Sequence, residues 1–151
     1  MRFLCDQMLG TLVKWLRIMG HDTEYARNEN DDELIKKAYA EERVLITRDK
    51  QLSKRYKNSV LITSTELKDQ IKKVIEAMDI RIEEKDMLSR CTLCNVPVIK
   101  ISKEEVVKKV PPYAHKTHDN FWICPKCNRV YWLGTHWENM KQFIEKIRDR
   151  G

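Results

Sequence analysis

Two groups of residues in this chain of 151 residues have the types and spacing of metal ligands. Three aspartates, Asp6, Asp31 and Asp49, each come after a short segment that is predicted to be a β-strand. The carboxyl ends of parallel strands meet at one edge of an open α/β sheet, and ligands bind at that edge. Carboxylates gathered there would suit Mg²⁺ or Mn²⁺. We therefore take these aspartates as candidate catalytic residues and as candidate ligands of a divalent cation.

A cation in such a site activates a water molecule, orients a scissile phosphate and neutralises charge on the leaving oxygen. Neighbouring carboxylates and hydroxyls are expected to support this chemistry, namely Asp32, Glu33, Thr47, Thr63 and Ser64. Taken singly, each aspartate also has a structural interpretation: Asp6 as a turn residue, Asp31 as a helix cap and Asp49 as a surface ion-pair partner. Three such residues at one predicted sheet edge favour the catalytic interpretation.

The second group is two Cys-x-x-Cys motifs, Cys91 to Cys94 and Cys124 to Cys127, separated by 29 residues. Two sulfur atoms from each motif can complete a tetrahedral Zn²⁺ site. A site with four protein ligands has no open position for a substrate, so its expected role is structural. It replaces the core that so short a segment can barely build.

Alternatives stay open for these cysteines. Iron could occupy the same thiolates in a coloured, redox-active protein. Thiol–disulfide chemistry is less favoured, because each motif has an equally good partner motif and disulfides are rare in the cytosol. A nearby histidine, His115, His118 or His136, could also replace one cysteine. The fifth cysteine, Cys5, lies in an apolar segment and is expected to be an inert, buried thiol.

Basic residues are concentrated beside the cysteine motifs. Residues 1–88 contain equal numbers of acidic and basic side chains, so the net charge of +6 comes entirely from residues 89–151. A basic segment beside an acidic site suggests a nucleic acid as the partner, because phosphate backbones attract lysine and arginine, although such a charge also aids solubility. Aromatic rings in this segment form a small core or, where exposed, a surface on which single-stranded RNA stacks. The candidate RNA-binding residues are Lys14, Arg17, Arg48, Lys50, Lys126 and Arg129.

Alternating strand and helix patterns position the aspartates. Apolar runs predict strands at 2–5, 23–26, 44–47 and 60–63, and helical spacing of apolar residues predicts helices at 8–19, 32–42, 51–56 and 66–78. This order predicts an α/β fold in which a parallel sheet carries helices on both faces. We expect a catalytic domain over residues 1–80, a linker over 81–90, and a zinc-ribbon module with a C-terminal helix over 91–151.

The composition argues against a membrane protein. Charged residues make up 34% of the chain and the mean hydropathy is −0.61. No apolar run approaches the roughly 20 residues that cross a bilayer. The N-terminus lacks the layout of a secretory signal, so a cytoplasmic location is expected.

Longer motifs run through both parts of the chain: FLCDQMLG at 3–10, LVKWLRIMGHD at 12–22, DDEL at 31–34, LITRD at 45–49, SRCTLCN at 89–95, VPP at 110–112, CPKC at 124–127 and YWLGTHW at 131–137. This set resembles the PIN-like ribonucleases with a C-terminal zinc ribbon, named for the mutator-seven C-terminal RNAse domain. The resemblance implies a PIN-like fold and metal-dependent endoribonuclease activity, with acidic residues at Asp6, Asp31 and Asp49. A typical PIN site has a fourth acid after a later strand, whereas this chain has no carboxylate there until Glu66.

Two functions are therefore compared. The leading one is a metal-dependent endoribonuclease that hydrolyses RNA phosphodiesters at the aspartates, with a structural zinc ribbon that helps to hold RNA. The alternative is an RNA-binding module of an RNA-processing assembly with little or no cleavage activity. Besides RNA, a second copy of the chain or an RNA-processing complex is the expected partner.

Overall fold

The computed structural model describes residues 1–149, apart from the side chains of Glu84, Thr135, His136, Trp137, Arg148 and Asp149. The chain divides into two compact units, and the division falls after Asn95. Residues 81–90, for which the sequence suggested a linker, lie in the first unit together with Cys91 and Cys94. The Leu88 amide donates a hydrogen bond of 2.7 Å to the Ile18 carbonyl, which ties this segment to the rest of the first unit.

The first unit is built on a four-stranded parallel sheet. Its strands are β1 (Arg2–Cys5), β2 (Asp22–Tyr25), β3 (Val44–Thr47) and β4 (Ser59–Leu61), in the order β2-β1-β3-β4. Every neighbouring pair is parallel, which confirms the predicted parallel sheet. Cys5 lies beside both Tyr25 and Ile46, and Thr47 lies beside Leu61, so the four strands end at a common edge.

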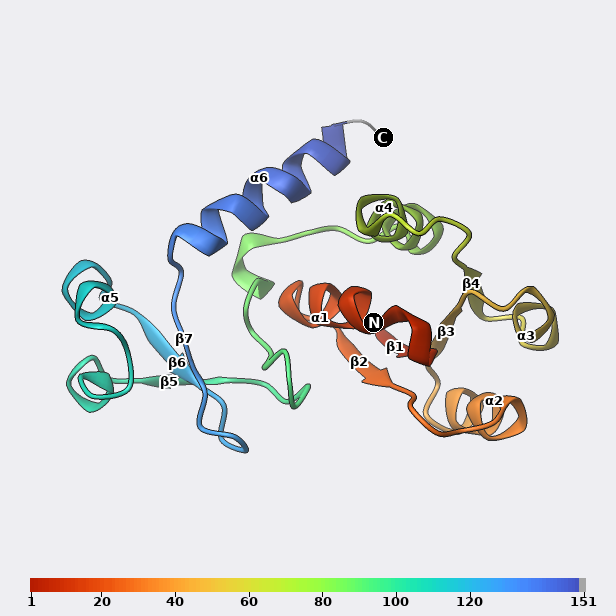
Figure 1. Cartoon of the computed structure of the whole chain (residues 1–151), viewed down its shortest axis with the longest axis horizontal. Helices are drawn as coiled ribbons and strands as arrows, with labels where there is room; N and C mark the ends of the chain where they lie inside the picture. Colours follow the sequence, from red (N-terminus) through yellow and green to blue (C-terminus); the bar gives the residue numbers. More distant parts are fainter. Residues whose placement is uncertain (150–151) are drawn as a thin grey trace. The chain divides into compact units, whose positions relative to one another are not determined.

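Four helices cover the two faces of this sheet: α1 (Gly10–Ile18), α2 (Asp31–Ala40), α3 (Lys50–Arg55) and α4 (Leu67–Met78). Helices α1 and α4 pack together on one face, and α2 and α3 lie on the other (Figure 1). All four predicted helices are confirmed. The first one begins differently, because the turn after Asp6 is a short 3-10 helix, η1 (Gln7–Leu9).

Apolar side chains form a core between the sheet and helices α2 and α3. Leu4 and Leu45 from the strands meet Leu34 and Ala38 of α2 and Leu52 of α3, and each is at most 1% exposed. Burying each leucine stabilises the fold by roughly 1.5–3 kcal/mol. The core therefore holds the strand ends, and with them the loops that follow, in fixed positions.

Gly20 ends α1 and allows a close approach by a neighbouring segment. Its φ of +93° lies in a region that side chains disfavour. A Cβ at this position would lie 2.6 Å from the Asp86 carbonyl oxygen. Asp86 belongs to a short 3-10 helix, η2 (Glu84–Asp86), so the glycine both stops α1 and makes room for this segment.

The second unit contains an antiparallel sheet of three short strands, β5 (Ile99–Ile101), β6 (Phe121–Ile123) and β7 (Val130–Tyr131), in that order. Its small core consists of Val106, Val110, Ala114 and Phe121. Val106 comes from a short 3-10 helix, η3 (Glu104–Val106), and Ala114 from helix α5 (Pro112–Thr117). The predicted C-terminal helix is α6 (Thr135–Asp149). Within residues 1–149, no helix is both long and apolar enough to span a membrane.

Candidate functional site

Two of the candidate catalytic residues flank the point where the strand order reverses. β1 continues through α1 to β2 on one side of the sheet, whereas β3 continues through α3 to β4 on the other. Such a reversal, at the carboxyl edge of neighbouring strands, is the usual ligand position in open α/β sheets. Asp6 follows β1 and Asp49 comes shortly after β3, so the topology places these two aspartates on either side of this position.

Thr47 connects the two aspartates. Its buried hydroxyl donates to Asp6 Oδ2 at 3.1 Å and accepts from the Asp49 amide at 3.0 Å. The other carboxylate oxygen of Asp6 accepts from the Gln7 amide at 2.7 Å, so both oxygens of Asp6 are held. Asp49 caps α3, because its Oδ1 accepts from two backbone amides of that helix at 2.9 and 3.2 Å. Thr47 therefore fixes the start of both loops.

Asp31, Asp32 and Glu33 occupy the first turn of α2, after the loop that leaves β2. The N-cap of this helix is Asn30, whose side chain accepts from the Glu33 amide at 2.9 Å. Asp32 is exposed and pairs with Arg55 of α3, and the hydrogen bond from Arg55 lowers the pKa of the Asp32 carboxyl. Asp31 is not the cap, and it lies in the first turn of α2, at the end of the loop that leaves the carboxyl end of β2.

The aspartates do not form a closed chelating cluster. Among the residues whose placement is described, the four cysteines are the only group of three or more acidic, histidine or cysteine side chains close enough to bind one ion. Mg²⁺ commonly binds through one or two carboxylates, several waters and substrate phosphates. The sheet edge therefore offers carboxylates for an open, partly hydrated site and not a preformed cage.

The loop after β4 carries the two other predicted hydroxyl residues, Thr63 and Ser64. The Ser64 hydroxyl donates to Asp69 at 3.0 Å and accepts from the Glu66 amide at the same distance. These residues line one side of a pocket of about 250 Å³ whose other side is formed by α4. Asp69 was missed by the sequence analysis, and its place in the first turn of α4 is the signal that could have identified it.

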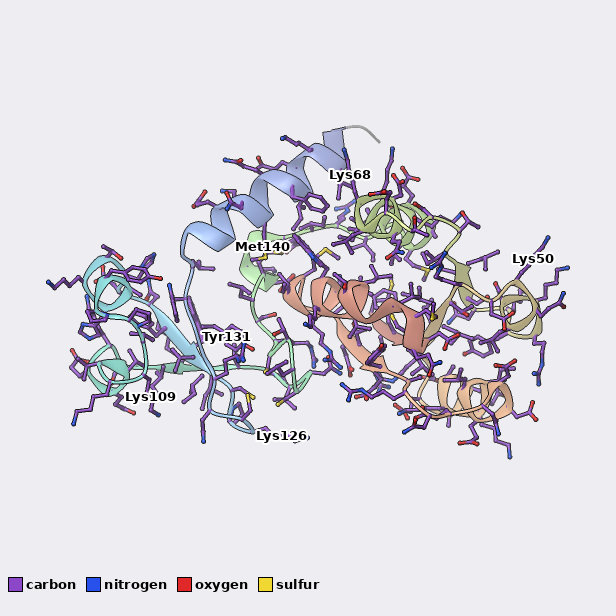
Figure 2. The ribbon with its side chains drawn as sticks, in the orientation of Figure 1. Lys50, Lys68, Lys109, Lys126, Tyr131 and Met140 are labelled. Atoms are coloured by element: carbon purple, nitrogen blue, oxygen red, sulfur yellow. The ribbon has the colours of Figure 1, made fainter. Side chains whose placement is uncertain are left out.

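Three predicted RNA-binding residues of the first unit reach the surface. Lys14 on α1 and Lys50 at the start of α3 are exposed, and Arg48 beside Asp49 is half-buried. Figure 2 shows Lys50 on the outside of α3. These side chains are accessible to a phosphate backbone.

Arg17, which the sequence analysis placed among the RNA-binding residues, is instead buried, with 9% of its surface exposed. Its guanidinium donates to the carbonyl oxygens of Thr23 at 2.9 Å and of Thr92 at 2.8 Å, and more weakly to that of Leu93 at 3.4 Å. Burial lowers the pKa of Arg17, although an arginine stays protonated in a protein. Thr92 and Leu93 lie inside the first Cys-x-x-Cys motif, so Arg17 holds that motif close to α1 and β2.

Asn95, the residue directly after this motif, is bonded to the edge strand β2. Its Oδ1 accepts from the Thr23 amide at 2.9 Å, and its Nδ2 donates to Asp22 at 2.7 Å and to Glu24 at 3.3 Å. Asn95 is 6% exposed and has a φ of +62°, a region that asparagine tolerates. One side-chain amide therefore bonds to three successive residues of β2. The sequence analysis missed this role.

Asp22 is the charged centre of this contact. Burial would raise the pKa of its carboxyl, but hydrogen bonds from Arg43, at 2.9 Å, and from Asn95 outweigh burial and lower the pKa to about 2. The side chain of Arg43 is 4% exposed and also donates to Glu41 at 2.7 Å and to the Phe3 carbonyl at 3.0 Å. Arg43 is thus almost fully buried, whereas the Asp22 side chain is 24% exposed, so the ion pair is only partly shielded from solvent.

The four cysteines of the two motifs come together. The sulfur atoms of Cys91, Cys94, Cys124 and Cys127 all lie within 4.8 Å of one another. The Cys94 amide points at Cys91 Sγ and the Cys127 amide at Cys124 Sγ, both at 3.4 Å. These amide contacts hold the first sulfur atom of each motif in place. This set of donors fits a tetrahedral Zn²⁺.

The histidines considered as replacement ligands have other partners. His115 Nε2 lies 2.9 Å from the Lys103 carbonyl oxygen. His118 Nδ1 lies 2.9 Å from the Thr117 hydroxyl. The side chain of His136 falls outside the described part of the chain. Among the described side chains, the four cysteines form the group that could hold a metal ion.

The basic and aromatic residues of the second unit divide between surface and core. Lys126 and Arg129 are exposed on the turn between β6 and β7, and Figure 2 shows Lys126 at the end of this turn. Phe121 is fully buried and Trp132 packs against the same core, as the core interpretation predicted. Trp122 is half-buried, and the Lys100 ammonium lies 4.7 Å from its ring centroid.

Burial shifts the pKa of two titratable groups of the first unit. Cys5 is fully buried, and burial raises the pKa of its thiol, which confirms the prediction of an inert cysteine. Burial also lowers the pKa of His21 to about 4, so its ring is neutral at pH 7. The ring meets Phe3 edge-on, with 5.6 Å between the ring centroids.

The comparison with known families covers both the sheet edge and the cysteine cluster. The Mut7-C RNAse domain matches residues 1–144. No curated protein and no solved structure matched the chain. The match confirms the resemblance carried by the sequence motifs, and the family description points to a nuclease role with RNA as substrate. The chain belongs to the Mut7-C RNAse domain family.

Proposed function

We propose that this protein is an endoribonuclease of PIN-like fold that hydrolyses RNA phosphodiesters with the help of Mg²⁺ or Mn²⁺. The observation that carries the proposal is the pair Asp6 and Asp49, both bonded to Thr47 where the strand order reverses. The family assignment supports ribonuclease activity in general. The sheet edge supports this particular site, because carboxylates at a ligand-binding edge suit a divalent cation.

The proposed cation ligands are Asp6, Asp31 and Asp49. A divalent cation would lower the pKa of a bound water, orient the scissile phosphate and neutralise charge on the leaving oxygen. Asp6 is half-buried and held through both carboxylate oxygens, so it presents its charge in a fixed direction. Asp49 uses one oxygen to cap α3, and Asp31 is supplied by the first turn of α2. Glu33, Thr63 and Ser64 are proposed to orient water around these carboxylates.

RNA binding is proposed to use the exposed cations of both units. Each cation that neutralises a phosphate releases counterions, so binding should weaken with salt by a factor that depends on the number of contacts. In the first unit these cations are Lys14, Arg48 and Lys50. In the second unit they are Lys126 and Arg129.

The cysteine cluster is proposed to hold a structural Zn²⁺. A tetrahedral ion with four thiolates has no position left for a substrate, so it would stabilise the fold and take no part in hydrolysis. The second unit has a core of only a few residues. A metal contributes folding free energy directly in such small modules.

The test is cleavage of labelled, structured RNAs with Mn²⁺, Mg²⁺ or EDTA by the wild type and by Asp6→Asn and Asp49→Asn. We expect either substitution to lower the cleavage rate about a hundredfold or more, since each removes a charge that acts on the transition state. EDTA should abolish cleavage by the wild type. Asparagine is as good an N-cap as aspartate, so Asp49→Asn should keep α3 intact.

Asp79→Asn is the matched control. Asp79 ends α4, is exposed, and lies at the opposite edge of the sheet, because α4 starts beside the carboxyl end of β4 and runs back. Its φ is +49°, which asparagine tolerates, so the fold should not change. We expect cleavage within twofold of wild type. Equal cleavage by all variants would reject the site, and RNA binding without metal-dependent cleavage would support the binding-module alternative.

A further inference from the structure

Tyr25, at the carboxyl end of β2, holds the turn that follows Asp6. In the parallel register it lies directly beside Cys5, which is the residue before Asp6. Its hydroxyl donates to the carbonyl oxygen of Gln7, in the short helix η1. The backbone of that turn is therefore bonded on one side by Tyr25, while Thr47 holds the Asp6 carboxylate on the other.

The space around Gly10 shows how closely Tyr25 packs against this turn. A Cβ at residue 10 would lie 3.2 Å from the Tyr25 hydroxyl oxygen and 3.5 Å from the ring carbon that bears it. Such a contact would be tighter than packed side chains normally make, so the tyrosine ring lies close against the start of α1. Gly10 therefore leaves room for the ring beside the turn.

Arg27 covers the same ring from the solvent side. Its guanidinium carbon lies 5.4 Å from the Tyr25 ring centroid, within the range of a cation–π contact. The loop around it is ordered by Glu29, whose carboxylate accepts from the Arg27 and Asn28 amides at 3.0 and 3.1 Å. Arg27 is exposed, so its charge is held in place at the sheet edge and still reaches solvent.

We propose that Tyr25 and Arg27 are the substrate-positioning pair of this site: Tyr25 fixes the turn that carries Asp6, and Arg27 binds an RNA phosphate beside it. The inference rests on the proposed ribonuclease function. A guanidinium suits this task because its planar fork can bond two phosphate oxygens at once. Stacking on Tyr25 restricts the guanidinium before RNA arrives, which lowers the entropy lost on binding.

The first test measures RNA affinity at several salt concentrations for Arg27→Gln and for the control Arg81→Gln. Arg81 is exposed and follows α4, so it carries the same charge at the opposite edge of the sheet. Loss of one phosphate contact should weaken binding and reduce the slope of log affinity against log salt by about 0.7 for single-stranded RNA. Arg27→Lys should restore the slope without restoring the affinity, because an ammonium cannot bond in a bidentate fork.

The second test separates positioning from binding with Tyr25→Phe. This variant keeps the ring under Arg27 and removes only the hydroxyl that bonds to Gln7. We expect kcat to fall about tenfold with KM and RNA affinity unchanged, because a small displacement of a catalytic group slows chemistry without weakening substrate binding. Thermal unfolding of the variant is the control that checks whether its fold is retained.

The outcomes distinguish this inference from the function on which it rests. Wild-type protein that neither binds nor cleaves RNA would reject both. Wild-type protein that cleaves RNA, with Arg27→Gln indistinguishable from Arg81→Gln, would reject only the phosphate contact. Unchanged kcat in a folded Tyr25→Phe variant would reject the positioning role of Tyr25.

Discussion

The two cysteine motifs have the same local structure and different surroundings. Both have the pattern Cys-x-x-Cys-Asn, and both asparagines adopt left-handed backbone, with φ of +62° at Asn95 and +64° at Asn128. In each, the backbone amide of the asparagine donates to the backbone carbonyl of the first cysteine, at 3.0 Å in the first motif and 2.9 Å in the second. The short motif therefore determines its own fold, whatever lies next to it.

The surroundings give the two motifs different roles. Asn95 is 6% exposed and bonds to β2 through its side chain, and Arg17 bonds to the carbonyls inside its motif. In the second motif, the residues from Pro125 to Asn128 are all exposed. The first motif has become part of a sheet edge, whereas the second is presented to solvent. Distant residues, and not the motif, decide this difference.

Metal removal should give the largest effect and should separate the two motifs. We expect a chelator, under reducing conditions, to unfold residues 96–134, since their small core depends on the metal. The sheet of the first unit should persist, with faster hydrogen exchange at the Thr23 amide, which loses its acceptor on Asn95. Hydrogen exchange measured residue by residue checks both. Unchanged protection at Thr23 would contradict the dependence of the β2 edge on the motif.

Substitution of Arg17 by leucine should have the next largest effect. It removes the guanidinium donor from the Thr23 carbonyl in a buried place, and from the Thr92 and Leu93 carbonyls in partly buried contacts. The loss of a buried donor alone costs about 1–3 kcal/mol. We expect the free energy of unfolding, measured in urea, to fall by about 3 kcal/mol. Lys14→Leu is the control on the exposed side of the same helix and should change it by less than about 0.5 kcal/mol. Similar losses for both would contradict the internal role of Arg17.

Replacement of each asparagine by glycine compares the motifs directly. Glycine accepts the left-handed backbone in both, so only the side chain is lost. Asn95→Gly should destabilise the protein by about 1–2 kcal/mol, because the Thr23 amide loses a buried partner. Asn128→Gly should be neutral within about 0.5 kcal/mol. A larger loss of stability in Asn128→Gly than in Asn95→Gly would show that the local turn of each motif, and not the bonds from Asn95 to β2, limits stability.

The smallest expected effect concerns pH. Because burial lowers the pKa of His21 to about 4, the unfolded chain takes up a proton between about pH 6.5 and 4 while the folded chain does not. Stability from this group is therefore complete above pH 6.5 and is lost as pH falls toward 4. His21→Gln should remove this part of the pH dependence, on the order of 1 kcal/mol once partial exposure is considered. Urea unfolding of the wild type and of His21→Gln at pH 5 and 7 measures this difference. An equal loss of stability in both proteins between pH 7 and pH 5 would contradict it.

The sequence predicted the elements of the first unit well because each carries a local signal. Runs of strand-forming residues predicted the strands, and helical spacing of apolar residues predicted the helices. The parallel arrangement then followed from the alternation of strands and helices. The family motifs and the paired cysteines indicated the nuclease role and the zinc site.

The sequence could not predict contacts made between residues far apart in the chain. Arg17 follows the helical pattern of an exposed cation, and the carbonyls of Thr92 and Leu93, to which it bonds, lie about 75 residues away. A carbonyl acceptor leaves no trace in residue type, so no pattern marks it. Asn95 was hidden for a related reason, because asparagine at that position is already explained by its backbone conformation.

Cys5 provides an internal reference for thiol chemistry. A reagent that alkylates thiolates cannot react with a fully buried thiol whose pKa is raised. After chelation, the four cysteines of the cluster should take up label while the sheet still protects Cys5. A mass increase of four labels would then report loss of the metal, and a fifth label would report opening of the sheet. A series of intact-mass spectra would thus follow metal loss and sheet opening separately in the same molecule.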